Sequence, residues 1–541
     1  MFHPDRSWTR RDFLKIASRA GLISAVPSLA RAAAALNSDT VCISILHTTD
    51  LHGHILPTAD YNGNLDVGGL ARCVTQIRRW RRKNQNTILI DVGDVYQGTD
   101  VGWRSKGQLM IDLFNHLRYD AWIVGNHEFD WGMDSFLRVL QKSKMPVLAA
   151  NSLLEGKAAG EIADRGNPFS KIRPYILKEI AGIRIAIIGI ATPGMPFWFR
   201  PEFTHGFEVA YPVELVRRAI KKAKSEGANA IVLTGHMGLK ARTGGDDFAN
   251  NVMSLTSEFP ETAAFIAGHT HQVIPSRLTN GVLLTQSNHF GIHVGRVDLV
   301  FDRNSKKLVG RKAQCQLMDG RFRLDRIVLS RAQSLLTESE VALAQPIGEL
   351  AETFHVRSRA GAPSDIERLI GAAIMESLRE RGTPVEGAVH GLFDDKNDFV
   401  AGRKTVKDVW NIIPYENYLV TAELTPDEIQ TVMEETYSSQ EGRSLLGFKV
   451  DTRGVGAARR ITSIAREDGW PLERGRKYVI AFNTFDSRSA GHRFMKLRAL
   501  LDSPMVNCRV HPVQTRDALI DYFQRHKVVR KIAPRQLPVA A

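Results

Sequence analysis

Short apolar runs alternate with helical segments over the first half of the chain, and this order constrains the fold more than any other feature. Strands are predicted at residues 41–47, 87–92, 121–124, 145–150, 183–190 and 228–233. Amphipathic helices are predicted between several of them, at residues 70–82, 107–118 and 212–225. Strands that alternate with helices are typical of α/β layering. After Phe265 the pattern changes to hairpin strands at residues 281–286, 295–301 and 308–317, so we expect parallel and antiparallel strands together.

The second half of the chain predicts another α/β unit. Helices are expected at residues 365–381, 405–410, 426–437 and 515–525, and strands at residues 418–423 and 478–483. The stretch before them is polar and helix-prone. We therefore expect a first domain at residues 41–325, a linker helix within 326–364 and a second domain at 365–535. Two domains of this size suit a chain of 541 residues.

The N-terminal segment reads as an export signal. Residues 9–15 (TRRDFLK) match the twin-arginine pattern, an apolar stretch follows at 16–29, and Ala30-Arg31-Ala32 offers small residues for cleavage. We predict a signal peptide at residues 1–33, the twin-arginine translocase as a partner during export, and a periplasmic or secreted mature protein. No other stretch approaches the roughly 20 apolar residues of a membrane span, so no transmembrane anchor is expected.

The charge of the chain is strongly basic. Lysine and arginine number 72 against 58 acidic residues, a net charge of +14, and removal of residues 1–33 would leave about +10. This excess favours an anionic substrate or surface without specifying either. The basic run at residues 78–83 is interpreted as a solvated helix face, and no stable nucleic acid partner is expected. Four cysteines without a CxxC pair indicate neither a disulfide scaffold nor a thiolate zinc site.

Polar side chains that can bind metal lie in five successive loops at strand ends, each of which contains a glycine. Carboxyl ends of strands are where ligand sites form in open α/β folds. The residues concerned are Asp50, His52, Asp94, Asn126, His127, His236, His269 and His271.

These side chains offer mixed oxygen and nitrogen ligands without thiolate. Such a set suits zinc, manganese, iron or cobalt better than calcium. The ligands are too many for one ion. Two divalent ions about 3.5–4 Å apart, bridged by a carboxylate, form the arrangement that phosphatases and nucleases use. We predict two divalent metal ions, with manganese or zinc favoured and iron, cobalt or magnesium as alternatives.

The same loops carry a family resemblance. Residues 46–54 (LHTTDLHGH), 93–99 (GDVYQGT) and 125–132 (GNHEFDWG), with the Gly-His pairs at 235–236 and 268–269, resemble the signature of calcineurin-like metallophosphoesterases. The branch that they resemble comprises secreted bacterial 5′-nucleotidases, UDP-sugar hydrolases and cyclic phosphodiesterases. The resemblance implies an α/β (α+β) chain: a four-layer αββα metallophosphoesterase domain followed by a C-terminal α/β substrate domain of 5′-nucleotidase type.

The resemblance also implies a role for each residue. Asp50, His52 and His271 would bind one metal, and Asn126, His236 and His269 the other, with Asp94 between the two. His127 would stabilise the phosphoryl transition state or the leaving oxygen, and Asp130 would orient its ring. A cationic imidazole beside a transferring phosphoryl group has this effect on chemical grounds as well. In the branch, glutamine often stands where this chain has His271, which bears on metal preference.

The second domain departs further from the branch. There, the nucleoside is held by arginines near a Gly-Gly-Ile-Arg motif and by two aromatic rings. Here the matching stretch is residues 387–391 (GAVHG), with His390 near the place of the arginine. Phe485 resembles one stacking ring, and Phe448 is a candidate for the second, with a core position as the alternative. The nucleoside specificity is therefore less defined than the hydrolysis.

Three functions follow from this pattern. The first is an exported metal-dependent hydrolase that cleaves phosphate esters of nucleotides or a related ester. The second keeps the fold but changes the bond: the thiosulfohydrolase of bacterial sulfur oxidation, similar in architecture and export, releases sulfate from a carrier-protein cysteine adduct. The altered arginine fits this alternative, whereas the GNHEFD string favours the first. The third, a binding protein with a relic site, would require missing ligands, and none is missing.

Overall fold

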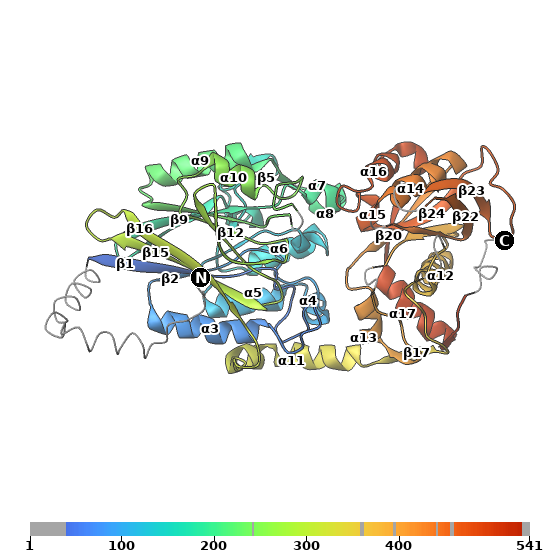
Figure 1. The fold of residues 1–541 in the computed structure, drawn as a ribbon, viewed down its shortest axis with the longest axis horizontal. Coiled ribbons are helices and arrows are strands. Elements are labelled where there is room, and N and C mark those ends of the chain that lie inside the picture. The colour runs from blue at the N-terminus through green and yellow to red at the C-terminus, as the bar shows by residue number, and fades with distance from the viewer. Residues whose placement is uncertain are drawn as a thin grey trace, which may run out of the picture.

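The computed structural model describes residues 39–240, 243–357, 362–392, 396–439, 442–454 and 459–532. The predicted signal peptide lies outside these residues. Within them, no helix has both the length and the apolar composition needed to cross a membrane. The described chain forms two lobes that lie side by side, joined along one edge by helix α11 (Arg326–Leu343) (Figure 1).

Two sheets form the centre of the N-terminal lobe. The first has seven strands, in the order β16 (Leu308–Leu317), β15 (His293–Asp302), β1 (Thr40–Thr48), β2 (Thr87–Asp91), β3 (Ala121–Ile123), β4 (Val147–Leu148) and β7 (Ile172–Arg173). The second has six, in the order β13 (Val273–Thr279), β14 (Val282–Ser287), β12 (Ala264–Ala267), β11 (Ala230–Gly235), β9 (Ile183–Ile190) and β8 (Tyr175–Ile180).

The alternation of side chains along each strand builds the layers. On β9, Ile185 and Ile187 face a core shared with β1 and β2, whereas Ala186 and Ile188 face helices α9 (Pro212–Ser225) and α10 (Val252–Glu258). The opposite outer face is covered by α3 (Leu70–Lys83), α5 (Gln108–Leu117) and α6 (Met133–Lys142). The order is therefore helices, sheet, sheet, helices, which confirms the four-layer prediction.

Parallel and antiparallel strands are combined as expected. β1 pairs with β2 in parallel and with β15 antiparallel, in the register Ser44 to Thr87 and Ser44 to Asp298. In the second sheet β9, β11 and β12 are parallel neighbours. The carboxyl ends of β1, β2 and β3 therefore meet at one edge of their sheet, and those of β11 and β12 at one edge of the other.

The C-terminal lobe contains a five-stranded sheet between two pairs of helices. Its strands follow the order β21 (Ser444–Leu446), β18 (Gly387–His390), β24 (Tyr478–Asn483), β20 (Tyr418–Leu424) and β25 (Arg509–Gln514). Helices α12 (Asp365–Glu380) and α17 (Thr515–His526) pack on one face, and α14 (Pro426–Ser438) and α16 (Met495–Leu501) on the other.

Smaller elements complete this lobe. A three-stranded sheet contains β19 (Gly402–Thr405), β17 (Pro346–Leu350) and β26 (Val528–Val529), and α13 (Val406–Ile412) follows β19. β22 (Phe448–Arg453) and β23 (Arg460–Arg466) form a hairpin. Because β17 pairs with β26, the chain has already joined the C-terminal lobe at residue 346, within the stretch predicted as a linker.

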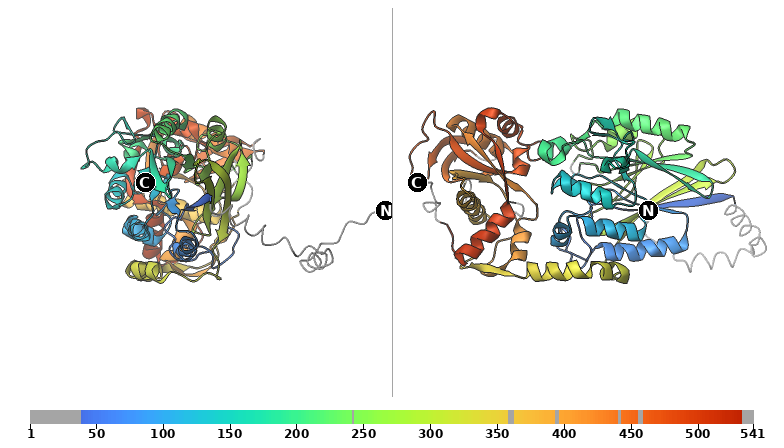
Figure 2. Two further views of the ribbon diagram at one scale, coloured as in Figure 1. Left: turned by 90° about the vertical axis from the view of Figure 1, so that its left-hand side faces the viewer. Right: turned by 180° about the vertical axis from the view of Figure 1, so that it is seen from behind.

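The two lobes also touch opposite α11. Short helices α7 (Met195–Trp198) and α8 (Pro201–Thr204) of the N-terminal lobe reach α15 (Thr484–Ser487) and α16, as the front and back views show (Figure 1; Figure 2, right). The side chain of Arg488 donates hydrogen bonds to the carbonyls of Phe199 at 3.0 Å and Pro196 at 3.1 Å. The cleft between the lobes is thus bounded by contacts on two sides.

Candidate functional site

The candidate metal ligands lie together at the edge where both sheets of the N-terminal lobe present their carboxyl strand ends. Asp50 and His52 follow β1, Asp94 follows β2, and Asn126 follows β3. His236 follows β11 of the second sheet, and His269 and His271 follow β12. Residues from 50 to 271 therefore converge on one small region, and the two sheets contribute opposite sides of it.

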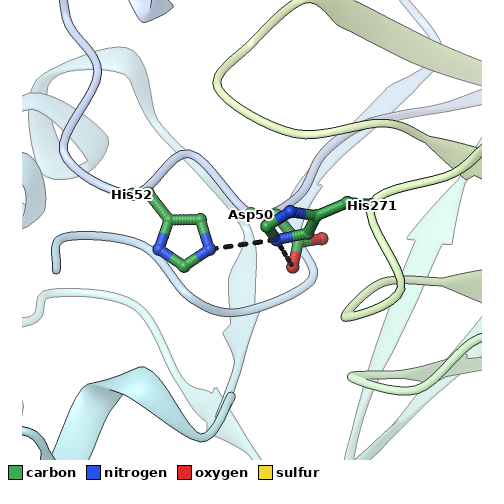
Figure 3. Close-up of side chains that lie close together, drawn as sticks. All are labelled: Asp50, His52 and His271. Carbon is green, nitrogen blue, oxygen red and sulfur yellow. Dashed lines mark hydrogen bonds and ion pairs between the residues drawn. The ribbon is translucent and has the colours of Figure 1, made fainter. Parts of the chain in front are cut away.

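One group of ligand atoms comprises Asp50, His52 and His271 (Figure 3). The Nε2 atom of His271 lies 3.4 Å from Asp50 Oδ1 and 3.2 Å from His52 Nε2. All three offer an atom within 4.8 Å of the others, and two of the side chains are buried. This spacing and the mixed donors suit one divalent cation.

A second group comprises Asp94, His236 and His269. Asp94 Oδ2 lies 3.0 Å from His236 Nε2 and 3.7 Å from His52 Nε2, so this carboxylate stands between the two groups. The amide oxygen of Asn126 lies 3.2 Å from His236 Nε2. The arrangement fits two cations that share Asp94, although the ligand role of each residue remains a prediction.

Two of the imidazoles are oriented by hydrogen bonds from Nδ1, the ring nitrogen that faces away from the cluster. His52 Nδ1 donates to the carbonyl of Gln97 at 2.8 Å, and His236 Nδ1 donates to the carbonyl of Val92 at 2.7 Å. A ring that carries its proton on Nδ1 presents a lone pair on Nε2, the atom that faces the cluster. The main chain thus sets the tautomer required for metal binding.

The electrostatics of the cluster favour a cation bound next to the ionised carboxylate of Asp94. Burial opposes ionisation, yet the neighbouring His236 holds the pKa of Asp94 well below its ordinary value. Burial likewise favours a neutral His236, but Asp94 raises the pKa of that ring to about 9. Burial lowers the pKa of His52 and of His269 to about 3, so both rings are neutral, as a ligand must be. A cation would take the place of the proton shared near Asp94.

The backbone at the cluster is held in an unusual conformation. Five of the candidate ligands have positive φ angles between 47° and 70°: Asp50, His52, Asp94, His269 and His271. Such angles are uncommon for residues with a Cβ and gather at functional sites, where the surrounding structure maintains them.

Gly93 and Gly125, which lie next to candidate ligands, allow neighbouring loops to approach closely. A Cβ on Gly125 would lie 2.3 Å from Asp94 Oδ1 and 2.5 Å from the Asp94 nitrogen. A Cβ on Gly93 would lie 2.7 Å from His236 Nδ1. The Gly-Asp and Gly-Asn-His strings are therefore required sterically where two loops cross.

Glu128 is a structural member of the site that the sequence reasoning did not assign. Its fully buried carboxylate accepts hydrogen bonds from the main-chain nitrogens of Asp94 at 3.1 Å, Val95 at 2.8 Å and Gly125 at 2.7 Å. Burial, with Asp94 nearby, raises the pKa of Glu128 to about 7. This residue ties the loop after β2 to the loop after β3. The sequence signal that could have identified it is the glutamate that follows the ligand loop in the string GNHE.

His127 and Asp130 form an ion pair beside the cluster. His127 Nδ1 lies 2.7 Å from Asp130 Oδ2, and the two rings of His127 and His52 are 5.2 Å apart. Burial opposes the charge, but Asp130 and Asp94 together raise the pKa of His127 to about 10. The structure therefore presents a charged imidazole toward the cleft, where it could stabilise developing negative charge.

The cleft between the lobes opens onto this ion pair. It has a volume of about 700 Å³, and its N-terminal wall includes Asn126, His127, His269 and Trp198. The C-terminal wall contributes aromatic and charged side chains, among them Tyr415, Arg443, Phe485 and Arg493. Two of the candidate ligands, Asn126 and His269, therefore face a cleft that both lobes line.

The two predicted stacking rings have different positions. Phe485 lines the cleft, with the Arg493 guanidinium 5.8 Å from its ring centre. Phe448 is 5% exposed, packs edge-to-face on Tyr478, and is not among the residues that line the cleft. The ring of Phe448 therefore lies in the core of the C-terminal lobe, which is the alternative position given for it above.

Comparison with protein families identifies both lobes. Residues 43–273 match the family model for calcineurin-like phosphoesterases, and residues 346–498 match the model for the 5′-nucleotidase C-terminal domain. Snake venom 5′-nucleotidase of Crotalus adamanteus is 31% identical over 275 residues, 48% of this chain and 45% of that protein. The 2′,3′-cyclic-nucleotide 2′-phosphodiesterase/3′-nucleotidase of Salmonella typhimurium is 29% identical over 306 residues, 51% of this chain and 46% of that protein. The chain thus spans less than half the length of these curated relatives.

Solved structures show the same fold over nearly the whole chain. The 5′-nucleotidase precursor of Thermus thermophilus superposes with a TM-score of 0.67 at 22% identity and covers 92% of this chain and 99% of its own. The sulfate thiohydrolase SoxB of the same organism has a TM-score of 0.61 at 16% identity and covers 91% and 95%. At these identities the likeness concerns the fold alone.

Proposed function

We propose that the chain, of which residues 43–273 match the calcineurin-like phosphoesterases and residues 346–498 match the 5′-nucleotidase C-terminal domain, is an exported hydrolase with two metal ions that cleaves phosphate esters of nucleotides. The observation that carries this proposal is the position of Asp94 between two groups of ligand atoms, next to a charged His127 at the cleft. The Crotalus adamanteus and Salmonella typhimurium relatives are nucleotidases by name, which supports the same substrate class here.

The proposed roles follow from the geometry. Asp50, His52 and His271 would hold one ion, and Asn126, His236 and His269 the other, with Asp94 shared. When bound, the ions would supply an activated hydroxide and neutralise charge on the phosphoryl group. His127, kept charged by Asp130, would donate a hydrogen bond or a proton to the leaving oxygen. Phe485 would contact the leaving group across the cleft.

Phosphate release tests the proposal directly. The mature protein, loaded with manganese or zinc, would be assayed with AMP, ATP, UDP-glucose, 2′,3′-cyclic AMP and an aryl phosphate. Faster turnover of nucleotides than of the aryl ester supports a nucleoside contact in the second lobe. Turnover of the aryl ester alone would leave the metal chemistry in place and redirect the search for the leaving group. No turnover of any ester, with both ions bound, would contradict the proposal.

One observation favours a second function. His390, which stands near the place of the nucleoside arginine, is buried and is not among the cleft residues. Arg443 does line the cleft, but its guanidinium is paired with Asp486 at 3.0 Å. This altered wall suits a thiosulfohydrolase acting on a carrier-protein cysteine adduct. Sulfate release from an S-sulfonated cysteine peptide would distinguish the two functions.

Export is also part of the proposal. Residues 9–15 and the alanines near residue 31 support a twin-arginine signal, and the periplasm or the exterior is then the site of action. Fusion of residues 1–40 to a reporter should direct it to the periplasm. Replacement of Arg10 and Arg11 by lysine should retain the reporter in the cytoplasm if the twin-arginine route is used.

A further inference from the structure

Tyr61 contacts the outer side of a candidate metal ligand. Its hydroxyl lies 3.0 Å from Nδ1 of His271. The other ring nitrogen of His271, Nε2, faces Asp50 and His52 at 3.4 Å and 3.2 Å. Because Nε2 faces the ligand group, Nδ1 is the nitrogen that carries the proton when an ion is bound, and the tyrosine oxygen is its acceptor.

The hydrogen bond that orients His271 differs from those that orient His52 and His236. His52 and His236 donate to main-chain carbonyls at the buried ends of the loop after β2. Tyr61 instead belongs to the segment between β1 and α3, and its side chain is 59% exposed. The segment is held locally by the Thr58–Val67 bridge and by hydrogen bonds from Asn62 and Asn64 to Asp60. One ligand of one ion is therefore oriented from an exposed loop.

A stack of rings keeps the tyrosine in place. His289 lies parallel to Tyr61 with ring centres 4.2 Å apart and parallel to His271 at 4.7 Å, both at an interplanar angle of 18°. Phe290 closes the stack edge-on, 4.3 Å from His289. Neither ring nitrogen of His289 has a hydrogen-bond partner among the described residues, although the side chain is buried. The rings of Tyr61 and His271 are 5.9 Å apart, so both pack against the same His289 ring, which supports the tyrosine beside His271.

We infer that Tyr61 is a positioning residue for the ion held by Asp50, His52 and His271. Its hydroxyl accepts the Nδ1 proton of His271, fixes the tautomer of that ring and strengthens the Nε2 ligand. The ion of this group is consequently the more readily released of the two, since one of its ligands depends on an exposed loop. The inference rests on the two-metal part of the proposed function.

Metal affinity tests this role without any assay of activity. The full-length mature chain, as wild type and as Tyr61→Phe, Tyr61→Leu and Tyr211→Phe variants, would be titrated with manganese and separately with zinc against a chelator of known affinity. Tyr61→Phe keeps the stacked ring and removes only the hydroxyl. Tyr211, at the start of α9, is 60% exposed and provides the matched control. We expect two binding steps for wild type, and in Tyr61→Phe a 10–100-fold weakening of one step alone.

Imidazole ¹⁵N shifts of the zinc-loaded protein provide the second readout. His271 should show a protonated Nδ1 in wild type, with a changed shift in Tyr61→Phe, while the signals of His52 and His236 stay in place. Unaltered affinities and shifts in Tyr61→Phe, or weakening only in Tyr61→Leu, would overturn the inference, because the ring rather than the hydroxyl would then matter. Failure of wild type to bind two ions would instead contradict the proposed function.

Discussion

The main-chain nitrogen of His127 donates a hydrogen bond to Asp94 Oδ1 across 2.8 Å. The carboxylate proposed to join two ions is therefore linked through the backbone to the residue proposed to act on the leaving group. The other oxygen of Asp94 faces His236 and His52. Asp94 thus connects the two ligand groups to His127 at the cleft. The first two predictions concern Asp94 and His127.

Asp94→Asn removes the shared negative charge while keeping the side-chain shape. We expect loss of metal retention and of turnover, because neither ligand group keeps a bridging carboxylate. Metal content by elemental analysis and phosphate release from AMP measure the two effects. Asp134→Asn, at an exposed position on α6, should retain both. Activity retained in Asp94→Asn would contradict the assignment of a two-metal site.

His127→Ala should keep both metals while kcat falls by about 10²–10⁴, the range for acid or electrostatic catalysis. Loss of metal in this variant would instead make His127 a ligand.

Asp130→Asn addresses the charge of His127. Without metal, and against the effect of burial, Asp130 and Asp94 together raise the pKa of His127 to about 10, so the ring stays charged until the pH rises through that value. Removal of the carboxylate should lower the pKa of the ring toward its ordinary value near 6.5. Titration of the His127 ring signal by NMR measures the shift, and an unchanged titration would show that Asp130 does not set the charge.

Gly125→Ala places a Cβ where two loops cross, 2.3 Å from Asp94 Oδ1. Since backbone and a ligand would have to move, we expect a loss of about 1–3 kcal/mol in the free energy of unfolding and weaker metal binding. Gly245→Ala is the matched control, because its nearest neighbour would lie at 3.7 Å, and a change within about 0.5 kcal/mol is expected. Denaturant unfolding measures both variants, and equal stabilities would contradict the steric argument.

Glu416→Ala removes a buried carboxylate between the lobes. Glu416 pairs with Arg516 at 3.1 Å and accepts a hydrogen bond from Gln97 of the other lobe at 2.5 Å, and neither charged side chain is more than 3% exposed. Loss of one partner from a buried pair typically costs about 3–5 kcal/mol. Glu179→Ala breaks an exposed pair with Arg184 and should cost less than about 1 kcal/mol. A similar effect of both changes on chemical denaturation would argue against the buried contact.

His47 should make the fold sensitive to acid. Burial lowers the pKa of its ring to about 3, so its contribution to stability is complete above pH 6.5 and is lost as the pH falls toward 3. Between pH 6.5 and 5.0 the wild type should lose about 2 kcal/mol relative to His47→Gln, at about 1.4 kcal/mol per pH unit. Urea unfolding at both pH values measures the difference. Parallel losses in the two proteins would show that His47 does not titrate on unfolding.

The sequence was sufficient for the parts of the fold that repeat a simple pattern. The strands that lead to Asp50, Asp94 and His236 are continuous apolar runs because both of their faces are covered, and such runs are recognisable without a structure. The hairpin at 448–466 is not predicted by the sequence, since its polar residues alternate with half-buried ones and its covered side is set by packing on α14. For the same reason the sequence leaves two positions open for Phe448, as only the packing shows which side of β22 is covered.

The residues of the site also divide into those that the sequence predicts and those that it does not. Ligands beside glycine could be located because each follows its own strand directly. Tyr61 and Glu416 could not, because they reach the site from a loop without periodicity and from the other lobe. Contacts between residues so far apart in the chain depend on how the sheets and lobes are assembled, which local patterns do not contain.

The carboxylate of Glu128 holds the loops after β2 and β3 together with three main-chain hydrogen bonds. The backbone that carries Asp94 and Asn126 is therefore joined by contacts of the chain itself, and we expect it to keep its place when metal is removed. Uptake of an ion then resembles capture by a rigid chelator and does not require coupled folding. Its speed would be limited by encounter and dehydration, and a chelator should strip the protein of metal while the native chain remains intact.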